Sequence, residues 1–136
     1  KSVNQFIKLE KENKLDKIET YYKFAKDVKK VKSDSLTNIK KILSENKKIV
    51  GYGAPAKATT ILNYFGLNEN YFKYVVEDSE IKHGKYIPET NIQIISKDDI
   101  NTEDYEFVLV LAWNFYDSIV KNNKSNFKNS KFIKLK

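Results

Sequence analysis

Residues 49–66 read IVGYGAPAKATTILNYFG, and this stretch decides the fold. The β-branched residues before the first glycine predict a short strand over 48–52. Pro55 suits the first position of a helix, and Gly66 suits the left-handed residue that follows a last helical turn. The stretch is therefore expected to run from a strand through a tight turn into a helix over 55–65.

The rest of the chain after residue 47 repeats this alternation. Further strands are expected at 71–78, 92–95, 107–112 and 131–135, with a loop over 79–90 and a helix over 114–120 that begins at Asn114 as its N-cap. Residues 107–112 read FVLVLA, which is typical of a strand covered on both faces. The pattern predicts an α/β fold with a Rossmann-like, doubly wound and mainly parallel sheet.

An N-terminal helical arm is expected to precede this sheet. Apolar residues recur at spacings of three and four over 15–46, and residues 2–13 could form a short preceding helix. Asp16 and Glu19 have the spacing of a capping box, and KSDS at 32–35 is a candidate interruption. We assign residues 1–46 to an arm that packs on the core and residues 47–136 to the α/β lobe.

The charge of the chain does not favour binding to nucleic acid. The 136 residues carry a net charge of +7, but residues 1–48 hold 14 lysines against 7 acids, while residues 49–136 hold 11 of each. Every basic residue is lysine, whereas arginine makes the commonest specific contact to a base. We therefore expect no nucleic-acid partner.

Other classes of protein are excluded by what the sequence lacks. Cysteine is absent and His83 is the single histidine, which leaves no disulfide framework and no thiolate or histidine-rich metal site. No apolar run approaches the roughly 20 residues of a transmembrane helix, and the charged start is unlike a signal peptide. We expect a cytoplasmic protein without a membrane partner. The absence of methionine leads us to expect a fragment of a longer protein.

The turn after the first strand is the main candidate for binding chemistry. Gly51, Gly53 and Ala56 have the spacing G-x-G-x-x-A of a dinucleotide turn, with amides at the start of a helix ready for an anion. Glu77 or Asp78 then lies about where a ribose-binding acid is expected. A tight turn without any ligand is an equally good interpretation of the same residues.

Several neighbouring residues have both a functional and a structural interpretation. Pro55 removes one amide donor from the turn, and Lys57 adds a charge that dinucleotide turns do not usually need. Thr59 is a phosphate ligand or an ordinary first-turn residue, and His83 is an acid–base group or, more simply, a surface histidine. Trp113 either stacks on a base or sugar or caps the core.

Three long segments together resemble one known family. They are KKIVGYGAPAKATTILNYFGL (47–67), YVVEDSEIKHGKYIPET (74–90) and FVLVLAWNFYDSI (107–119), and LDKIETYYKFAKDVKKVK (15–32) extends the similarity upstream. They resemble the C-terminal lobe of sugar C-methyltransferases that use S-adenosylmethionine. The positions that match are Gly51, Tyr52, Gly53, Ala54, Pro55, Ala56, Lys57, Asn63, Tyr64, Lys82, Gly84, Trp113 and Asn114. The departures are Ala58, Thr59, Ser79, Glu80, Glu89, Asn91 and Ala112, so the resemblance does not fix the sugar.

The resemblance implies a division of labour between parts of a larger enzyme. A nucleotide-linked sugar would lie between this lobe and the central methyltransferase domain of the same polypeptide. S-adenosylmethionine and zinc would belong to parts outside this chain, so the isolated domain is expected to bind no cofactor, to hold no catalytic residue and to be inactive. The alternative is an NAD(P)-binding Rossmann module of an oxidoreductase or regulatory protein. The candidate substrate-binding residues are Gly53, Ala54, Pro55, Ala56, Lys57, Thr59, Asn63, Lys82, His83, Trp113 and Asn114.

Overall fold

The computed structural model describes residues 2–135 and confirms an α/β fold with an N-terminal helix. Its helices and strands are, in chain order, α1 (Val3–Glu12), α2 (Ile18–Ser44), β1 (Ile49–Tyr52), α3 (Ala56–Phe65), β2 (Tyr74–Val76), β3 (Tyr86–Ile87), β4 (Ile92–Ile95), β5 (Phe107–Val110), α4 (Tyr116–Asn123) and β6 (Lys131–Ile133). Short 3-10 turns are η1 (Glu80–Lys82), η2 (Lys97–Asp99), η3 (Thr102–Asp104) and η4 (Trp113–Phe115).

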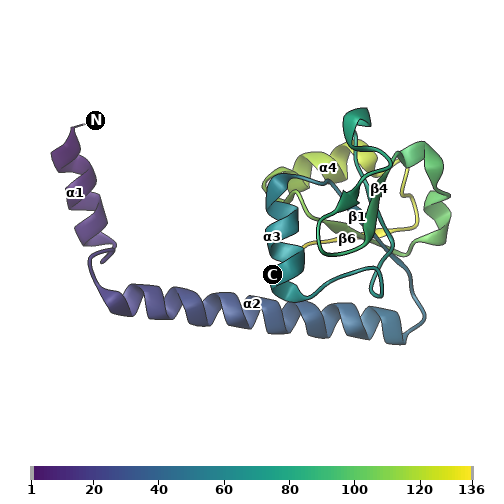
Figure 1. Ribbon diagram of the computed structural model, residues 1–136. Helices are drawn as coiled ribbons and strands as arrows, with labels where there is room; N and C mark the ends of the chain where they lie inside the picture. The colour runs from purple at the N-terminus through teal and green to yellow at the C-terminus, as the bar shows by residue number, and fades with distance from the viewer. Residues whose placement is uncertain (1, 136) are drawn as a thin grey trace.

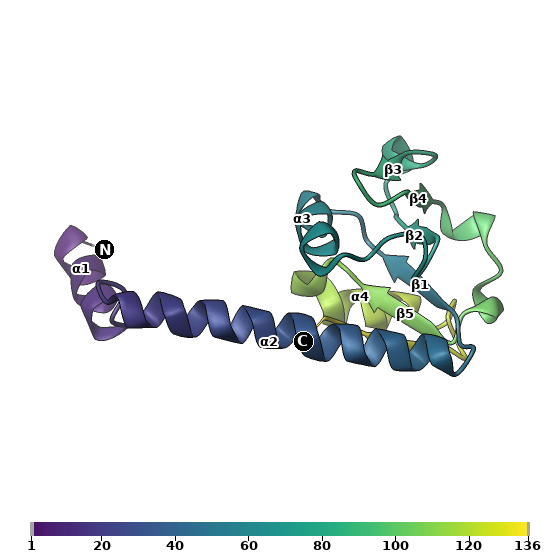
Figure 2. The same ribbon diagram turned by 60° about the horizontal axis from the view of Figure 1, so that its bottom comes forward.

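The strands form one six-stranded sheet in the order β3-β4-β2-β1-β5-β6. Figure 2 shows β3, β4, β2, β1 and β5 following one another across it. Every neighbouring pair is parallel except β3 and β4. The order reverses at β1, because β2 and β4 lie on one side of it and β5 and β6 on the other. The carboxyl ends of β1 and β5 therefore meet where ligands gather in sheets of this kind.

Each face of the sheet carries its own apolar core. On one face, Ile39 and Ile42 of α2 and Leu62 of α3 pack against inward residues of the strands. On the other face, Val50 and Phe127 belong to a second buried cluster, against which α4 packs. Because both faces are covered, β5 is buried over three of its four residues. This burial is the physical reason for the apolar run in the sequence.

The helix α2 is a single helix of 27 residues that continues through 32–35, where an interruption was predicted. Its N-cap is Lys17 rather than Asp16, so the predicted capping box is also wrong. Residues 13–16 instead belong to the turn that ends α1, where Lys14 has a φ of 55° and the Leu15 amide donates to the Glu10 carbonyl. Helix α2 therefore begins only after this turn is complete.

Helix α2 packs on the core only through its second half. Its buried residues are Ser35, Ile39 and Ile42, and neither residues 18–34 nor α1 contain a buried side chain. Figure 1 shows α2 running past the sheet-containing body, with α1 turning away at its far end. No helix within residues 2–135 is both long and apolar enough to cross a membrane. The boundary at residue 46 stays a prediction.

Two local predictions need correction. The predicted loop over 79–90 contains η1 and the two-residue strand β3, which pairs antiparallel with β4 and was too short to leave a period in the sequence. Asn114 is not the N-cap of α4, because it lies inside η4 and the helix begins after Phe115. Strand β5 ends at Val110, so the turn η4 follows directly from the carboxyl edge of the sheet.

Candidate functional site

The turn after β1 lies directly against the turn after β5. Gly53 has a φ of 83°, and its amide donates to the Val76 carbonyl over 2.8 Å. A Cβ placed on Gly53 would lie 2.9 Å from the Cβ of Ala112, which is closer than two such atoms come in proteins. Glycine is thus required here both by the backbone and by the contact. The turn after β1 and the segment after β5 are therefore in contact at the carboxyl edge of the sheet.

Some backbone amides of this turn already donate hydrogen bonds within the protein. The Ala54 amide donates to Oε2 of Glu77 over 2.7 Å, and the Ala58 amide donates to the Pro55 carbonyl over 2.8 Å. Pro55 is the N-cap of α3 and has no amide hydrogen to offer. The amide cradle predicted for residues 53–58 is therefore reduced by the protein's own contacts.

Two amides remain at the start of α3. Those of Ala56 and Lys57 have no hydrogen-bond partner within residues 2–135. They belong to the first turn of a ten-residue helix, whose amino end carries a partial positive charge. Lys57 belongs to the same helical turn, and its ammonium lies 4.3 Å from the centre of the Trp113 ring.

Trp113 is the aromatic neighbour of Lys57 in this candidate site. It is 37% exposed and begins η4, directly after the buried Ala112. Asn114 follows it and is exposed. A cation held over an exposed indole ring contributes only about 0.5–1 kcal/mol, so a ligand can replace either partner at low cost. The arrangement can present a positive charge, two amides and an aromatic face to one ligand.

Glu77 is the centre of a hydrogen-bonded cluster beside this site. Lys82 donates through Nζ to Oε2 of Glu77 and to the Ala54 carbonyl, each over 3.1 Å, and the Ser79 amide donates to Oε1 over 3.2 Å. Burial raises the pKa of Glu77, but the bonds from the Ala54 amide, Lys82 and the Ser79 amide outweigh it and hold the pKa below 4.5. The carboxylate stays ionised and is fully engaged.

Asp78 is engaged on the other side of the sheet. The Tyr52 hydroxyl lies 2.7 Å from Oδ1 of Asp78 and 3.0 Å from Oδ1 of Asn123, and the Tyr52 side chain is buried. Burial and the bond to Asp78 raise the pKa of Tyr52 well above its usual range, so the hydroxyl keeps its proton and donates. The carboxylate of Glu77 is therefore fully engaged, whereas Asp78 is exposed and, within residues 2–135, is bonded through Oδ1 alone. Neither acid adds support for the dinucleotide alternative.

A polar crevice opens beside Tyr52 and Asp78. It has a volume of about 410 Å³ and lies between the carboxyl ends of β1 and β5 and helix α4, with Asp78, Ser118 and Asn122 among its lining residues. Sequence reasoning missed it, because Tyr52 and Asn123 are 71 residues apart and only the fold brings them together. The one available signal was the polar group Asn122–Asn123 at the end of a helix.

The other predicted site residues connect loops around the site. Asn63 donates through Nδ2 to the carbonyls of Thr59, over 2.9 Å, and Pro88, over 3.1 Å, which ties α3 to the loop that follows β3. The ring atom Nε2 of His83 lies 2.7 Å from the Glu77 carbonyl oxygen. Most of the predicted residues thus fall into two neighbouring groups, one around Lys57 and Trp113 and the other around Glu77, whereas Asn63 bonds elsewhere, to the Thr59 and Pro88 carbonyls.

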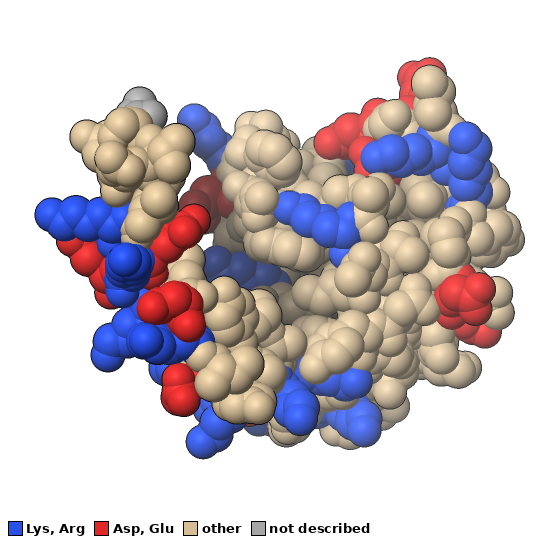
Figure 3. All heavy atoms as spheres, turned by 60° about the vertical axis from the view of Figure 1, so that its left-hand side comes forward, with Lys and Arg blue, Asp and Glu red and all other residues tan. Residues whose placement is uncertain are grey.

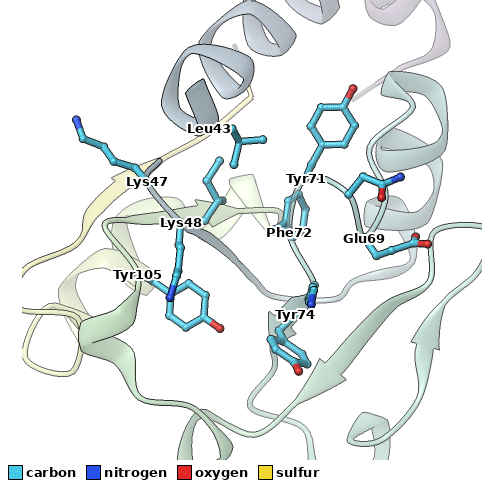
Figure 4. Close-up of a pocket in the computed structure, with 11 residues that line it drawn as sticks. Leu43, Lys47, Lys48, Glu69, Tyr71, Phe72, Tyr74 and Tyr105 are labelled. Carbon is cyan, nitrogen blue, oxygen red and sulfur yellow. The ribbon is translucent and has the colours of Figure 1, made fainter. Parts of the chain in front are cut away.

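A second hollow lies at the opposite edge of the sheet. It has a volume of about 380 Å³ and is lined at the amino ends of β1 and β2 by three tyrosines and three lysines, among other residues. Figure 4 shows Lys48 and Tyr105 on one side of it and Glu69 on the other. It contains none of the predicted site residues. Within residues 2–135, no group of three or more potential ligands could hold a metal ion.

Comparisons with known proteins identify the family of the chain. The family model of the C-methyltransferase C-terminal domain matches residues 1–135. The chain is 28% identical over 109 residues to the C-methyltransferase NovU of Streptomyces niveus, a match that covers 80% of this chain and 26% of that protein. The chain therefore spans about a quarter of the length of this relative. It belongs to the family of C-methyltransferase C-terminal domains.

Proposed function

We propose that this domain binds the nucleotide-linked sugar that a C-methyltransferase modifies, at the carboxyl ends of β1 and β5. The observation that carries the proposal is the pairing of Lys57 with Trp113, together with two unused amides in the helical turn that holds Lys57. The doubly wound, Rossmann-like interpretation supports it, since the parallel order β4-β2-β1-β5-β6 reverses beside this site.

The chemistry of the site suits a ligand in which a phosphate is joined to a sugar or a base. A phosphate oxygen can accept from the Ala56 and Lys57 amides and pair with the Lys57 ammonium, while a base or sugar packs on the indole of Trp113. Lys82 adds little net charge, because Glu77 neutralises it at 3.1 Å. Lys57 is thus the residue that we expect to contribute most to recognition of the phosphate.

The transfer of the methyl group is assigned to the rest of the enzyme. S-adenosylmethionine, the catalytic base and zinc would belong to parts of the polypeptide outside this domain, including its central methyltransferase domain. The short share of NovU that the chain covers, 26%, is consistent with such a division. The domain alone is then expected to bind substrate without transferring a methyl group.

The single tryptophan of the chain provides a direct test. Titration with a thymidine- or uridine-diphosphate sugar should change the fluorescence of Trp113 until it saturates. The Lys57→Ala variant should bind about tenfold or more weakly, since a charge-assisted hydrogen bond contributes about 1.5–3 kcal/mol. Lys73→Ala is the matched control, because Lys73 is exposed and lies at the amino end of β2, in the hollow at the opposite edge.

Three results would contradict the proposal. One is saturable binding of NAD together with no binding of either nucleotide sugar, by fluorescence and by calorimetry. Another is equal binding by the Lys57→Ala variant and the wild-type domain. A loss of affinity in Lys73→Ala as large as that in Lys57→Ala would show that binding depends on total charge rather than on this site.

A further inference from the structure

An apolar groove runs between α2 and α3 and ends at Trp113. It has a volume of about 560 Å³ and its lining is dominated by aromatic and aliphatic side chains. These are Phe24, Val28 and Val31 from α2, Ile61, Tyr64 and Phe65 from α3, and Trp113. We call it the α2–α3 groove. Phe24 is 67% exposed and Tyr64 is 43% exposed, so large apolar surfaces face outward here. Contiguous apolar patches on a protein surface commonly mark an interaction site.

The groove has almost no charge of its own. Asp27 is the only acidic or basic side chain in its lining, and Lys23 already pairs with it through Nζ at 2.6 Å from Oδ2. Lys32 lies at the border, with its Nζ 4.6 Å from the centre of the Tyr64 ring. Figure 3 looks onto this side of the molecule, where charged side chains gather on the arm and uncharged atoms form most of the surface behind it. An occupant of the groove therefore needs apolar side chains.

The first half of α2 has no cover within residues 2–135. Residues 18–34 contain no buried side chain, although the helix continues without a break. Most helical stability in proteins comes from the packing of an amphipathic face, and short helices alone are marginal in water. The exposed Phe24 and Val31 lie on this half. A partner that packs here would supply the missing contacts.

We propose that the α2–α3 groove is the docking surface for the methyltransferase part of the same polypeptide. This inference rests on the proposed function, because it requires a longer enzyme around this domain. The family match describes a C-terminal domain of C-methyltransferases, and 74% of NovU lies outside the matched part (100 − 26). The occupant is thus an apolar helix or loop from the part of the chain that carries methyl transfer.

Trp113 connects this groove to the candidate substrate site. Its ring lines the end of the groove and also lies 4.3 Å from the Lys57 ammonium. A partner seated in the groove would cover the indole from one side and leave the side near Lys57 to the ligand. Docking and substrate binding would then share one wall, which places the substrate between the two parts of the enzyme.

Hydrogen–deuterium exchange on the full-length polypeptide tests the proposal. Amides of residues 18–31 and 57–65 should exchange about tenfold or more slowly in the full-length protein than in the domain alone, because docking adds to the free energy of local opening. Amides of β1 and β5 report whether the fold itself is unchanged. Equal exchange of 18–31 in both proteins would overturn the proposal. Protection that appears in the domain alone as its concentration rises would also overturn it, in favour of a second copy.

A pair of aromatic substitutions identifies the surface. Phe24→Ser in the full-length protein should abolish the added protection, whereas Tyr86→Ser should leave it unchanged. Both residues are exposed, at 67% and 58%, but Tyr86 lies on the edge strand β3 outside the groove. Equal effects of the two substitutions would refute the assignment of the groove. Nucleotide-sugar binding to the isolated domain is measured separately, so a failure of docking and a failure of the proposed function give different results.

Discussion

The contact between Gly53 and Ala112 predicts an unusually large cost for adding one methyl group. In a Gly53→Ala variant, the new side chain must adopt the left-handed conformation at a φ of 83° and also lie 2.9 Å from the Cβ of Ala112. The two turns that frame the candidate site meet at this contact. The substitution therefore measures how firmly the site is held together.

The magnitude follows from two separate contributions. A left-handed non-glycine residue costs roughly 1–2 kcal/mol, of which about 0.4–1 kcal/mol is offset because alanine stiffens the unfolded chain. Overpacking of a buried contact adds about 1–3 kcal/mol. We therefore expect Gly53→Ala to lower the free energy of unfolding by about 1–5 kcal/mol, with the contact as the larger part.

Gly66→Ala is the matched control in a urea unfolding experiment followed by circular dichroism. Gly66 also has a left-handed φ, 72°, but no atom lies within 4 Å of the position that its Cβ would take. Its substitution should cost only the backbone strain, about 0–1.5 kcal/mol after the same offset. The difference between the two variants then isolates the contact with Ala112.

A double-mutant cycle completes the test. Ala112→Gly removes the opposing methyl group, so Gly53→Ala in that background should cost no more than Gly66→Ala does in the wild-type protein. If Gly53→Ala and Gly66→Ala cost the same in the wild-type protein, to within about 0.5 kcal/mol, the two turns do not pack as described. An unchanged cost of Gly53→Ala after removal of the Ala112 methyl group would equally refute the reasoning.

Three further substitutions test other parts of the structure by urea unfolding. Glu77→Gln should lower stability at pH 7 by about 1–3 kcal/mol, because Lys82 keeps its charge but loses the carboxylate with which it pairs. The folded-state pKa of Glu77 lies below its usual value, so the wild-type protein should lose this contribution to stability as the pH falls through that pKa. The Glu77→Gln variant should show no such loss. Equal slopes of unfolding free energy against pH in the two proteins would contradict the assignment. Tyr52→Phe should lower the free energy of unfolding by about 1–2 kcal/mol, because Asp78 and Asn123 lose the hydroxyl donor. An unchanged free energy of unfolding would show that water replaces the hydroxyl. Ile39→Ala should cost about 2–5 kcal/mol if α2 packs on the core as described, whereas a cost below about 1 kcal/mol would contradict that packing.

Much of the fold could be predicted because its signals are local. The apolar run after residue 106 predicted β5, and the turn residues Pro55 and Gly66 predicted α3. Both predictions are correct to within about two residues, which is the usual uncertainty of element ends. The two-residue strand β3 was missed, because its pairing with β4 depends on neighbours rather than on its own sequence. The start of α2 was misplaced, because residues 13–16 form the turn that ends α1 and the helix begins only at Ile18.

The candidate site was predictable only in part, since its contacts depend on the assembled sheet. Lys57 and Trp113 each follow a predicted strand, and the carboxyl ends of parallel strands share one edge of the sheet, which accounts for their meeting. The sequence did not reveal that Glu77 takes the Ala54 amide, since the same acid had an equally sound interpretation as a ribose ligand. The roles of the individual site residues toward a ligand stay predictions.

The continuity of α2 has a mechanical consequence. At about 1.5 Å per residue, the helix of 27 residues is a rod of about 40 Å that begins at α1 and ends beside the sheet. Its second half is fixed to the core by Ile39 and Ile42. A force on the amino end of α2 would therefore turn the body that carries Trp113. The orientation of the arm then sets the orientation of the whole domain.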